Sequence, residues 1–163
     1  ADISIDRNKI IFFIFNKLDL IEDKSKFKKN INNYLKNRYD KYRIINIEFI
    51  SAKKNLGINK ILNQIIQKKN LITIKLHKNK LNKFIKKINK NTNIPKINKV
   101  IIKPKYIVQT DYKIPKFKVF INSKRRAPKL FQKFFDNVFR KFFGLEGIPV
   151  QYEFISSKNP FSS

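Results

Sequence analysis

Two apolar runs, each followed by a helical pattern, define the first part of the chain. Residues 10–15 read IIFFIF and residues 44–50 read IINIEFI. Such runs of β-branched and aromatic residues are typical of strands buried on both faces of a parallel sheet. Apolar residues then recur at helical spacing, namely Phe27, Ile31, Tyr34 and Leu35 after the first run and Ile58, Ile61, Leu62, Ile65 and Ile66 after the second. This order predicts an α/β unit over residues 1–70.

The predicted α/β unit is too small to stand alone. Two strands do not make a stable parallel sheet, because such sheets are covered on both faces and need central neighbours. The chain also starts at Ala1 and contains no Met. We therefore expect a piece of a longer or processed protein, with the α/β unit incomplete at its N-terminal side.

A different pattern begins after about residue 70. Leu81, Phe84, Ile85 and Ile88 predict a helix. Strands are expected over residues 100–110, where Pro104 indicates an edge or a bulge, over residues 117–121, and over residues 149–155. Before the last strand comes a long helix from Pro128 to its cap at Gly144. The order predicts an αββαβ domain of the α+β class over residues 71–163.

The long helix has one apolar and one polar face. The apolar positions are Leu130, Phe131, Phe134, Phe135, Val138, Phe139, Phe142 and Phe143. The positions expected on the polar face are Lys129, Gln132, Lys133, Asp136, Asn137, Arg140 and Lys141. Because most Phe residues fall at helical or strand spacing, core packing explains them better than base stacking.

The composition favours a polyanionic partner. The formal net charge is +27 and the pI about 10.3, as in many nucleic-acid-binding domains. Codon bias is the alternative explanation. Lys, Asn, Ile and Phe are all abundant, and all four have AT-rich codons, so an AT-rich genome would raise the lysine content without any functional demand. With no Cys and a single histidine, disulfides and thiolate metal sites are excluded and we predict no metal site. His77 lies in a Lys-rich stretch, where a solvated surface position is expected.

The sequence offers no membrane-spanning segment. Its longest apolar run, residues 10–15, is far shorter than the roughly 18 residues that a spanning helix needs. No signal-peptide pattern opens the chain. We expect a cytoplasmic protein of a bacterium or endosymbiont, or its organellar equivalent.

The strongest local motif is Asn16-Lys17-Leu18-Asp19, directly after the first apolar run. Guanine presents two adjacent donors on its Watson–Crick edge, and one carboxylate can accept both with charge assistance. Asp19 would take this role, while Asn16 would brace the loop and contact the base. The stem of Lys17 would lie along the ring. Taken alone, the tetrapeptide is better explained by a polar turn after a strand, because Asn and Lys are so abundant in this chain.

A second motif, Ser51-Ala52-Lys53, follows the second apolar run and leads into a helix. The pair of motifs resembles the fourth and fifth motifs of P-loop GTPases, in which a backbone N–H of the second loop reaches the base carbonyl. The glycine-rich phosphate loop and the switch segments are absent from this sequence, which has only three glycines. The resemblance therefore implies a guanine-binding end without catalytic residues.

The second part of the chain is similar to the C-terminal KH-like domain of the Der (EngA) GTPase family. The matching segments are Leu81-Asn82, residues 103–109 (KPKYIVQ), residues 114–117 (IPKF), residues 120–122 (FIN), residues 139–144 (FRKFFG), residues 147–150 (GIPV) and Asn159-Pro160-Phe161. Departures are Leu18 where the family has Trp, and Phe in place of Tyr in the long helix. The resemblance covers nearly the whole chain.

The resemblance implies a fragment of a GTP-binding factor of large-ribosomal-subunit assembly. Its expected partners are GTP or GDP and ribosomal RNA, with Mg²⁺ bound only in an intact GTPase domain. The fragment alone should not hydrolyse GTP, and its oligomeric state is not predicted. The alternative is a non-enzymatic RNA-binding module or remnant. A third option is the Era family, which also joins a GTPase domain to a KH domain. A member of that family should keep a G-x-x-G between two helices, and this sequence does not.

Candidate RNA contacts are basic residues around the predicted strands. They are Lys103, Lys105, Lys124, Arg125 and Arg126, with Lys99 beside them. Such residues would track phosphates, although a solvated face explains them equally well. Gly144-Leu145-Glu146-Gly147 spells the G-x-x-G of KH domains. Because Pro149 follows too soon for a second helix, we predict a helix cap and turn there instead.

Overall fold

The computed structural model describes residues 3–4, 7–39, 44–90, 94–97 and 100–156. These residues fall into two compact units. The first unit comprises Ala1–Ile72 together with Glu146–Pro149. The second comprises Thr73–Leu145 and Val150–Ser163.

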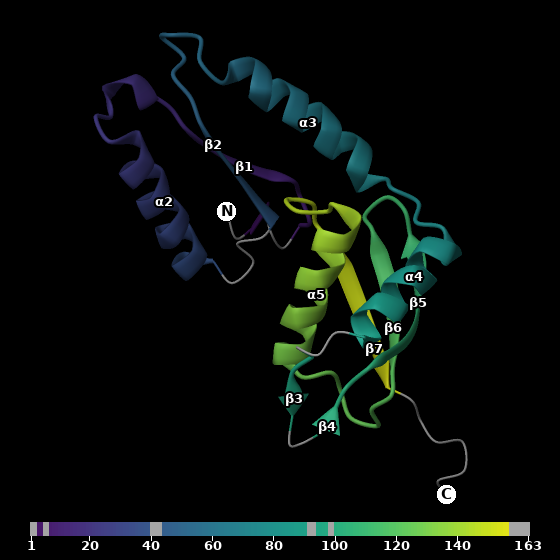
Figure 1. Cartoon of the computed structure of the whole chain (residues 1–163). Coiled ribbons are helices and arrows are strands. Elements are labelled where there is room, and N and C mark those ends of the chain that lie inside the picture. The colour runs from purple at the N-terminus through teal and green to yellow at the C-terminus, as the bar shows by residue number, and fades with distance from the viewer. Residues whose placement is uncertain (1–2, 5–6, 40–43, 91–93, 98–99, 157–163) are drawn as a thin grey trace, which may run out of the picture. The chain divides into compact units, whose positions relative to one another are not determined.

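The first unit contains a two-stranded parallel sheet. Strand β1 (Ile11–Phe15) pairs with β2 (Ile45–Phe49), residue by residue from one end to the other. Helix α2 (Lys24–Arg38) connects the two strands, and α3 (Ile58–Ile72) follows β2 (Figure 1). The elements of this unit thus come in the predicted order, strand, helix, strand, helix.

Helix α2 is fixed to the sheet by aromatic packing. The Asp23 carboxylate accepts a hydrogen bond from the backbone N–H of Lys26 at 2.8 Å and so caps the helix. One turn later, the ring of Phe27 meets the rings of Phe15 and Phe49 edge-on, at centroid distances of 6.4 and 5.9 Å. Phe15 and Phe49 stack on each other at 5.3 Å. This cluster lies beside the loops that follow both strands.

The expected burial of both strands on both faces is wrong for the described chain. Ile11 and Ile45 are buried, but Ile14 is 47% exposed. In the predicted stripe of α3, Ile61 is buried, whereas Leu62 and Ile66 are exposed. The physical reason is that a two-stranded sheet offers too little surface to cover an apolar helix face and both sides of its own strands.

A buried carboxylate links β2 to α3. Glu48 is only 9% exposed, and it accepts hydrogen bonds from Lys60 Nζ at 2.9 Å and Gln64 Nε2 at 2.6 Å. Ionised groups away from water need such partners. Glu48, a charged residue within the second apolar run, therefore has a structural role that the pattern of hydrophobic positions does not reveal.

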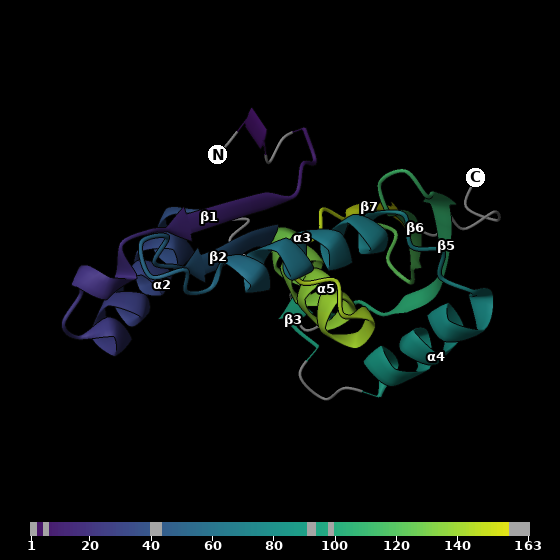
Figure 2. The same cartoon turned by 90° about the horizontal axis from the view of Figure 1, so that it is seen from above.

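The second unit is a three-stranded sheet with helices on one face. Its elements are α4 (Lys78–Asn89), β3 (Lys96–Ile97), β4 (Val100–Ile101), β5 (Pro104–Asp111), β6 (Lys116–Ile121), α5 (Lys129–Phe143) and β7 (Gln151–Ser156). The strand order is β5-β6-β7, with β5 antiparallel and β7 parallel to β6. Figure 2 shows α4 and α5 on the same side of these strands.

The predicted strand over residues 100–110 is interrupted. Val100–Ile101 forms a small antiparallel hairpin with Lys96–Ile97, and a separate strand begins at Pro104. The pairing of β5 with β6 shifts register between Pro104 and Tyr106, and β5 lies at the sheet edge. The prediction that Pro104 marks an edge or bulge is confirmed, because proline cannot donate to a strand ladder.

Phenylalanine rings fill the core of the second unit. Phe117, Val119 and Ile121 of β6 are fully buried, as their alternation predicts. Phe84 of α4 packs against Phe139 of α5 at a centroid distance of 5.1 Å. Further rings of α5 surround these contacts, namely Phe131, Phe135, Phe142 and Phe143. The core-packing interpretation is confirmed for the residues that are fully buried.

The polar face predicted for the long helix is wrong at Arg140, which is only 3% exposed. Its Nε donates to Asp136 Oδ1 at 2.7 Å, and Nη1 donates to the carbonyl of Leu145 at 3.1 Å. The two charged positions are one helical turn apart, so they pair at the end of the helix. Leu130, in the predicted apolar stripe, is instead 58% exposed. It lies in the first turn of α5, next to Lys129.

Candidate guanine-binding and nucleic-acid-binding sites

The two motifs of the first unit meet at one edge of its sheet. Residues 16–19 follow β1, and residues 51–53 follow β2. Because the strands are parallel, their carboxyl ends lie together. The backbone N–H of Leu18 donates to the carbonyl of Ile50 at 2.9 Å, and the N–H of Ile50 donates to Phe15 at 2.9 Å. The ladder therefore extends beyond the strands and fixes both loops.

Asn16 ties the loops together through its side-chain oxygen. Asn16 Oδ1 accepts hydrogen bonds from the backbone N–H of Lys17 at 2.7 Å and of Ala52 at 3.0 Å. Lys17 adopts the left-handed conformation, with φ 62° and ψ 33°, which is uncommon for a residue with a side chain. The bracing role predicted for Asn16 thus has a defined geometry.

Asp19 and Ser51 form the second link between the loops. The fully buried Ser51 donates from Oγ to Asp19 Oδ1 at 2.5 Å, and the same Oγ accepts from the N–H of Lys54 at 3.2 Å. The Ser51 hydroxyl holds the pKa of Asp19 below its ordinary value. The positive charges of Lys54 and Lys53 act in the same direction, against the effect of partial burial. The carboxylate is therefore ionised near neutral pH.

The arrangement leaves a defined set of groups for a ligand. An ionised carboxylate has about four acceptor positions, and Ser51 uses one of those of Asp19. Within the described residues, the Asn16 amide nitrogen and the Lys53 backbone N–H make no hydrogen bond. The Ala52 N–H is already hydrogen-bonded to Asn16, so of these two amides only that of Lys53 is left without a partner among the described residues. Sequence reasoning missed this detail, because a motif does not tell which amides are used internally.

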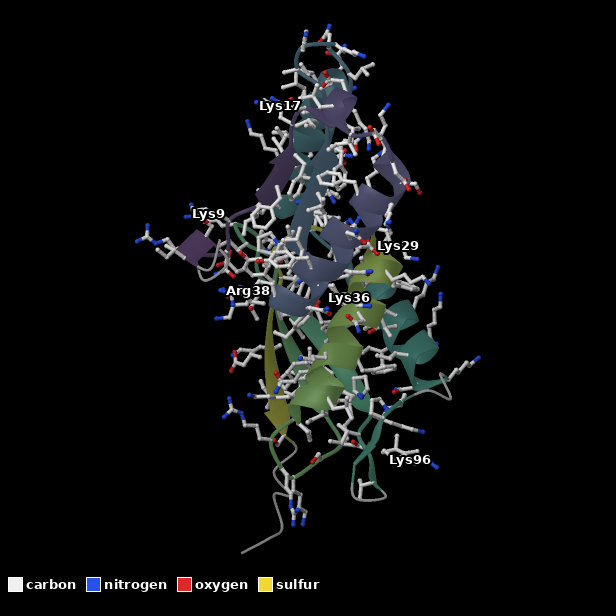
Figure 3. All side chains as sticks on the ribbon, turned by 90° about the vertical axis from the view of Figure 1, so that its left-hand side faces the viewer. Lys9, Lys17, Lys29, Lys36, Arg38 and Lys96 are labelled. Carbon is white, nitrogen blue, oxygen red and sulfur yellow. The ribbon has the colours of Figure 1, made fainter. Side chains whose placement is uncertain are left out.

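The lysine side chains of the two loops are exposed. Lys17 and Lys53 both face solvent, and Figure 3 shows Lys17 at the end of the unit where β1 ends. Figure 3 also shows Lys29, Lys36 and Arg38 along α2, all of them exposed. Positive charge is therefore spread over the first unit as well, and net charge alone does not locate an interface.

The predicted RNA-binding residues gather at one end of the second unit's sheet. Lys103 and Lys105 flank the start of β5, while Lys124, Arg125 and Arg126 follow the end of β6. All five are exposed. The antiparallel pairing of β5 and β6 brings these ends together. Lys99 and the Asn159-Pro160-Phe161 segment lie outside the described residues.

Backbone contacts fix this basic end. The N–H of Lys103 donates to Asn122 Oδ1 at 2.8 Å, and the N–H of Asn122 donates back to the Lys103 carbonyl at 3.0 Å. Ser156 Oγ, at the end of β7, donates to the carbonyl of Arg125 at 3.1 Å. The ends of β5 and β6 are therefore linked to each other, and the end of β7 is linked to the basic segment that follows β6.

The G-x-x-G segment is a helix cap and turn. Gly144 ends α5 in the left-handed conformation, with φ 66°, as the sequence predicts. Gly147 also has a positive φ, 72°. The next regular element is β7, starting at Gln151, so no second helix follows. Glu146 is exposed and would repel phosphate.

Other functional features are limited in the described part of the chain. His77 is exposed at the start of α4. The described residues contain no cluster of three or more His, Cys, Asp or Glu side chains suited to a metal ion. Among the described helices, none has the length and apolar character needed to span a bilayer.

Comparisons with known proteins identify relatives for both units. Residues 75–154 match the KH-domain-like family of EngA bacterial GTPase enzymes, C-terminal. The chain is 29% identical over 149 residues to GTPase Der of Finegoldia magna, which covers 91% of this chain and 34% of the relative. It is 26% identical over 160 residues to GTPase Der of Orientia tsutsugamushi (strain Ikeda), covering 97% of this chain and 35% of the relative.

The match has a clear extent. The chain spans about a third of the length of the curated relatives it matches. The family model covers most of the second unit together with residues 146–149 of the first, and the pairwise similarities include the rest of the first unit as well. Residues 75–154 therefore form a KH-domain-like domain of the type found at the C-terminus of EngA GTPases, and nearly the whole chain is similar to the C-terminal part of GTPase Der proteins.

Proposed function

We propose that this chain is the guanine-binding end and RNA-docking domain of a GTP-binding factor that acts in assembly of the large ribosomal subunit. The observation that carries the nucleotide part is the hydrogen-bonded pair of loops, in which Asp19 is held by Ser51 and Asn16 by Ala52. The compartment that fits this role is the cytoplasm of a bacterium or endosymbiont, or its organellar equivalent.

In this proposal the chain supplies base recognition. The Asp19 carboxylate accepts the ring N–H and exocyclic amine of guanine, which are adjacent donors that adenine lacks. The Asn16 amide nitrogen donates to a ring acceptor, the Lys53 N–H donates to the base carbonyl, and the Lys17 stem covers the ring. The Ser51 hydrogen bond to Asp19 orients the carboxylate before the base arrives.

Hydrolysis requires elements that this sequence does not contain. Phosphoryl transfer depends on a phosphate loop, Mg²⁺ and a positioned water. The chain has only three glycines, Gly57, Gly144 and Gly147, and none belongs to a phosphate-loop motif. Mg²⁺ and the phosphates of GTP would therefore be bound by other parts of a complete GTPase domain.

The second unit supplies the RNA-docking function. Its five candidate basic residues are exposed at one end of a sheet, which is the arrangement expected for phosphate contacts. The alternative function, an RNA-binding module without nucleotide chemistry, needs only this unit. The absence of a phosphate loop from the sequence favours that alternative for the chain on its own.

Base selectivity tests the proposal on the chain as it stands. In an NMR titration with GDP and ADP, GDP should shift the backbone amides of Lys17, Asp19 and Lys53, and ADP should not. Glu22→Gln, which removes one exposed negative charge near the loop, should leave the GDP response intact. Equal shifts with GDP and ADP would mean that the loops bind anions without recognising guanine. The proposal of guanine binding would then fail, and the RNA-binding module would remain as the function.

A further inference from the structure

The three-stranded sheet of the second unit has one covered and one open face. Phe117, Val119 and Ile121 of β6 are buried on the helix side, where Phe117 meets Phe139 of α5 at a centroid distance of 4.9 Å. Successive side chains of a strand point to opposite faces. Lys118 and Phe120 therefore belong to the face that the helices do not cover.

Two aromatic rings lie side by side on the open face. Tyr106 of β5 pairs with Phe120 of β6 across the sheet. Their rings stack with centroids 4.1 Å apart and planes 14° apart. Tyr106 is 47% exposed, and Ile155 of β7 is the next residue in the same row. We call Tyr106 and Phe120 the aromatic platform.

Positive charge surrounds the aromatic platform. Lys105 directly precedes Tyr106, and Lys103 lies two residues before Lys105. Both lysines are exposed. Arg125 lies near the same strand ends through its contact with Ser156. Two acidic residues have a lysine beside them on this face: Glu153 is 3.9 Å from Lys118 Nζ, and Asp111 pairs with Lys116 across the strands. A pair of stacked aromatic rings with cations close by offers both an apolar π-surface for a base and positive charge for its phosphates.

We propose that the aromatic platform stacks an unpaired RNA base while the basic residues at the strand ends hold the neighbouring phosphates. The inference rests on the proposed RNA-docking function and adds a site and a substrate class, single-stranded RNA. Exposed aromatic rings on a sheet offer stacking to any base, because every base has a π-face. The turn at Gly144–Gly147 supplies no second helix for a backbone clamp, so single-strand contact falls to the open face.

The test compares single-stranded and duplex RNA with the 163-residue chain. Affinities for an unstructured oligonucleotide and for a blunt duplex of equal length are measured by fluorescence anisotropy. Tyr106→Ala should weaken single-strand binding about five- to a hundredfold and change duplex binding less than twofold. Tyr106→Phe, which keeps a ring, should bind single strands like the unaltered chain.

Matched variants separate stacking from other effects. Tyr112→Ala removes another exposed tyrosine, in the turn after β5, and should leave both affinities unchanged. Tyr106→Leu keeps an apolar side chain in the strand without an aromatic ring, so it should fold and still show the loss. Upfield shifts of the Phe120 ring protons on adding the single strand would show the stacking directly.

The outcomes distinguish the platform from the proposed function. If the unaltered chain binds both RNAs but Tyr106→Ala and Tyr112→Ala behave alike, the platform is overturned and RNA docking stands. If the unaltered chain binds neither RNA, both fail. If Tyr106→Ala instead dissociates a dimer in sedimentation and leaves RNA binding unchanged, a protein covers this face and the platform is again overturned.

Discussion

The hydroxyl of Ser51 donates a 2.5 Å hydrogen bond to the carboxylate of Asp19, across 32 positions of sequence. The bond joins the ends of two parallel strands and explains why a small hydroxyl residue follows β2. It also contributes most to lowering the pKa of Asp19, the residue on which guanine recognition depends in the proposed function.

Ser51→Ala should raise the pKa of Asp19 toward its ordinary value of 3.8, because the hydrogen bond from Ser51 contributes most to lowering it. A lowered folded-state pKa gives stability that is present above the unfolded pKa and is lost as pH falls through the folded pKa. Ser51→Ala should therefore shift this loss to higher pH. Carboxyl-carbon NMR of Asp19 measures the change.

The control for this titration is Ser25→Ala, which removes an exposed hydroxyl from α2. It should leave the Asp19 titration unchanged. An Asp19 pKa that is the same in Ser51→Ala and in the unaltered chain would show that another group stabilises the carboxylate.

The second prediction is that the chain alone does not turn over GTP. Catalysis in P-loop GTPases comes from positioning and charge stabilisation around the phosphates, and this sequence lacks the glycine-rich loop that provides them. Phosphate release with micromolar chain, GTP and Mg²⁺ should equal the protein-free blank. Phosphate release above that blank, reproduced with two independent preparations, would contradict the prediction and show that this chain contains catalytic residues for GTP hydrolysis.

The third prediction concerns the buried ion pair of α5. Asp136→Ala leaves the Arg140 guanidinium without its carboxylate, in a position that is only 3% exposed. Breaking one partner of a buried pair costs about 3–5 kcal/mol, and we expect the lower end of this range because Asp136 itself is 27% exposed. Urea denaturation followed by circular dichroism measures the loss.

The comparison for the ion pair is the double variant Asp136→Leu with Arg140→Met, which removes both charges together. It should cost less than Asp136→Ala, since no uncompensated charge remains. A loss of under about 1 kcal/mol for Asp136→Ala would instead place the pair with ordinary surface salt bridges.

Much of the architecture follows from the sequence. The alternation of Phe117, Val119 and Ile121 gave β6 and its buried face, and Pro128 and Gly144 gave the limits of α5. These elements were predictable because local pattern and tertiary burial agree at each position. The short hairpin of β3 and β4 was not predictable, since two-residue strands carry no periodicity.

Errors arose where burial depends on distant partners. Arg140 has a charged side chain at a polar helix position, yet Asp136 and the Leu145 carbonyl make its burial favourable. Ile14 and Leu62 are apolar, yet they stay exposed because the described chain offers nothing to cover them. Sequence reasoning also identified the two guanine-type motifs without revealing that Asn16 uses the Ala52 amide.

The fourth prediction concerns the basic cluster after β6. Replacing Lys124, Arg125 and Arg126 by Ala should weaken RNA binding and flatten its salt dependence, because fewer counterions are released. Each lost contact should reduce the slope of log affinity against log salt by about 0.7 for single strands. Anisotropy titrations at several salt concentrations measure both quantities.

The charge-matched control lies in the first unit. Replacing Lys29, Lys36 and Arg38 of α2 by Ala removes three charges of the same sign and should leave the slope close to that of the unaltered chain. Equal losses from both triple variants would show that RNA senses overall charge, which is the outcome expected if codon bias produced the lysines.

Exchange of base specificity at Asp19 tests the central claim most directly. In an NMR titration, the Asp19→Asn chain should lose its response to GDP and gain one to XDP, because the amide can donate to the extra carbonyl of xanthine. The lost charge-assisted hydrogen bonds should cost roughly 1.5–3 kcal/mol. Glu22→Gln should keep the preference for GDP. An Asp19→Asn chain that still prefers GDP over XDP would contradict guanine recognition by these loops.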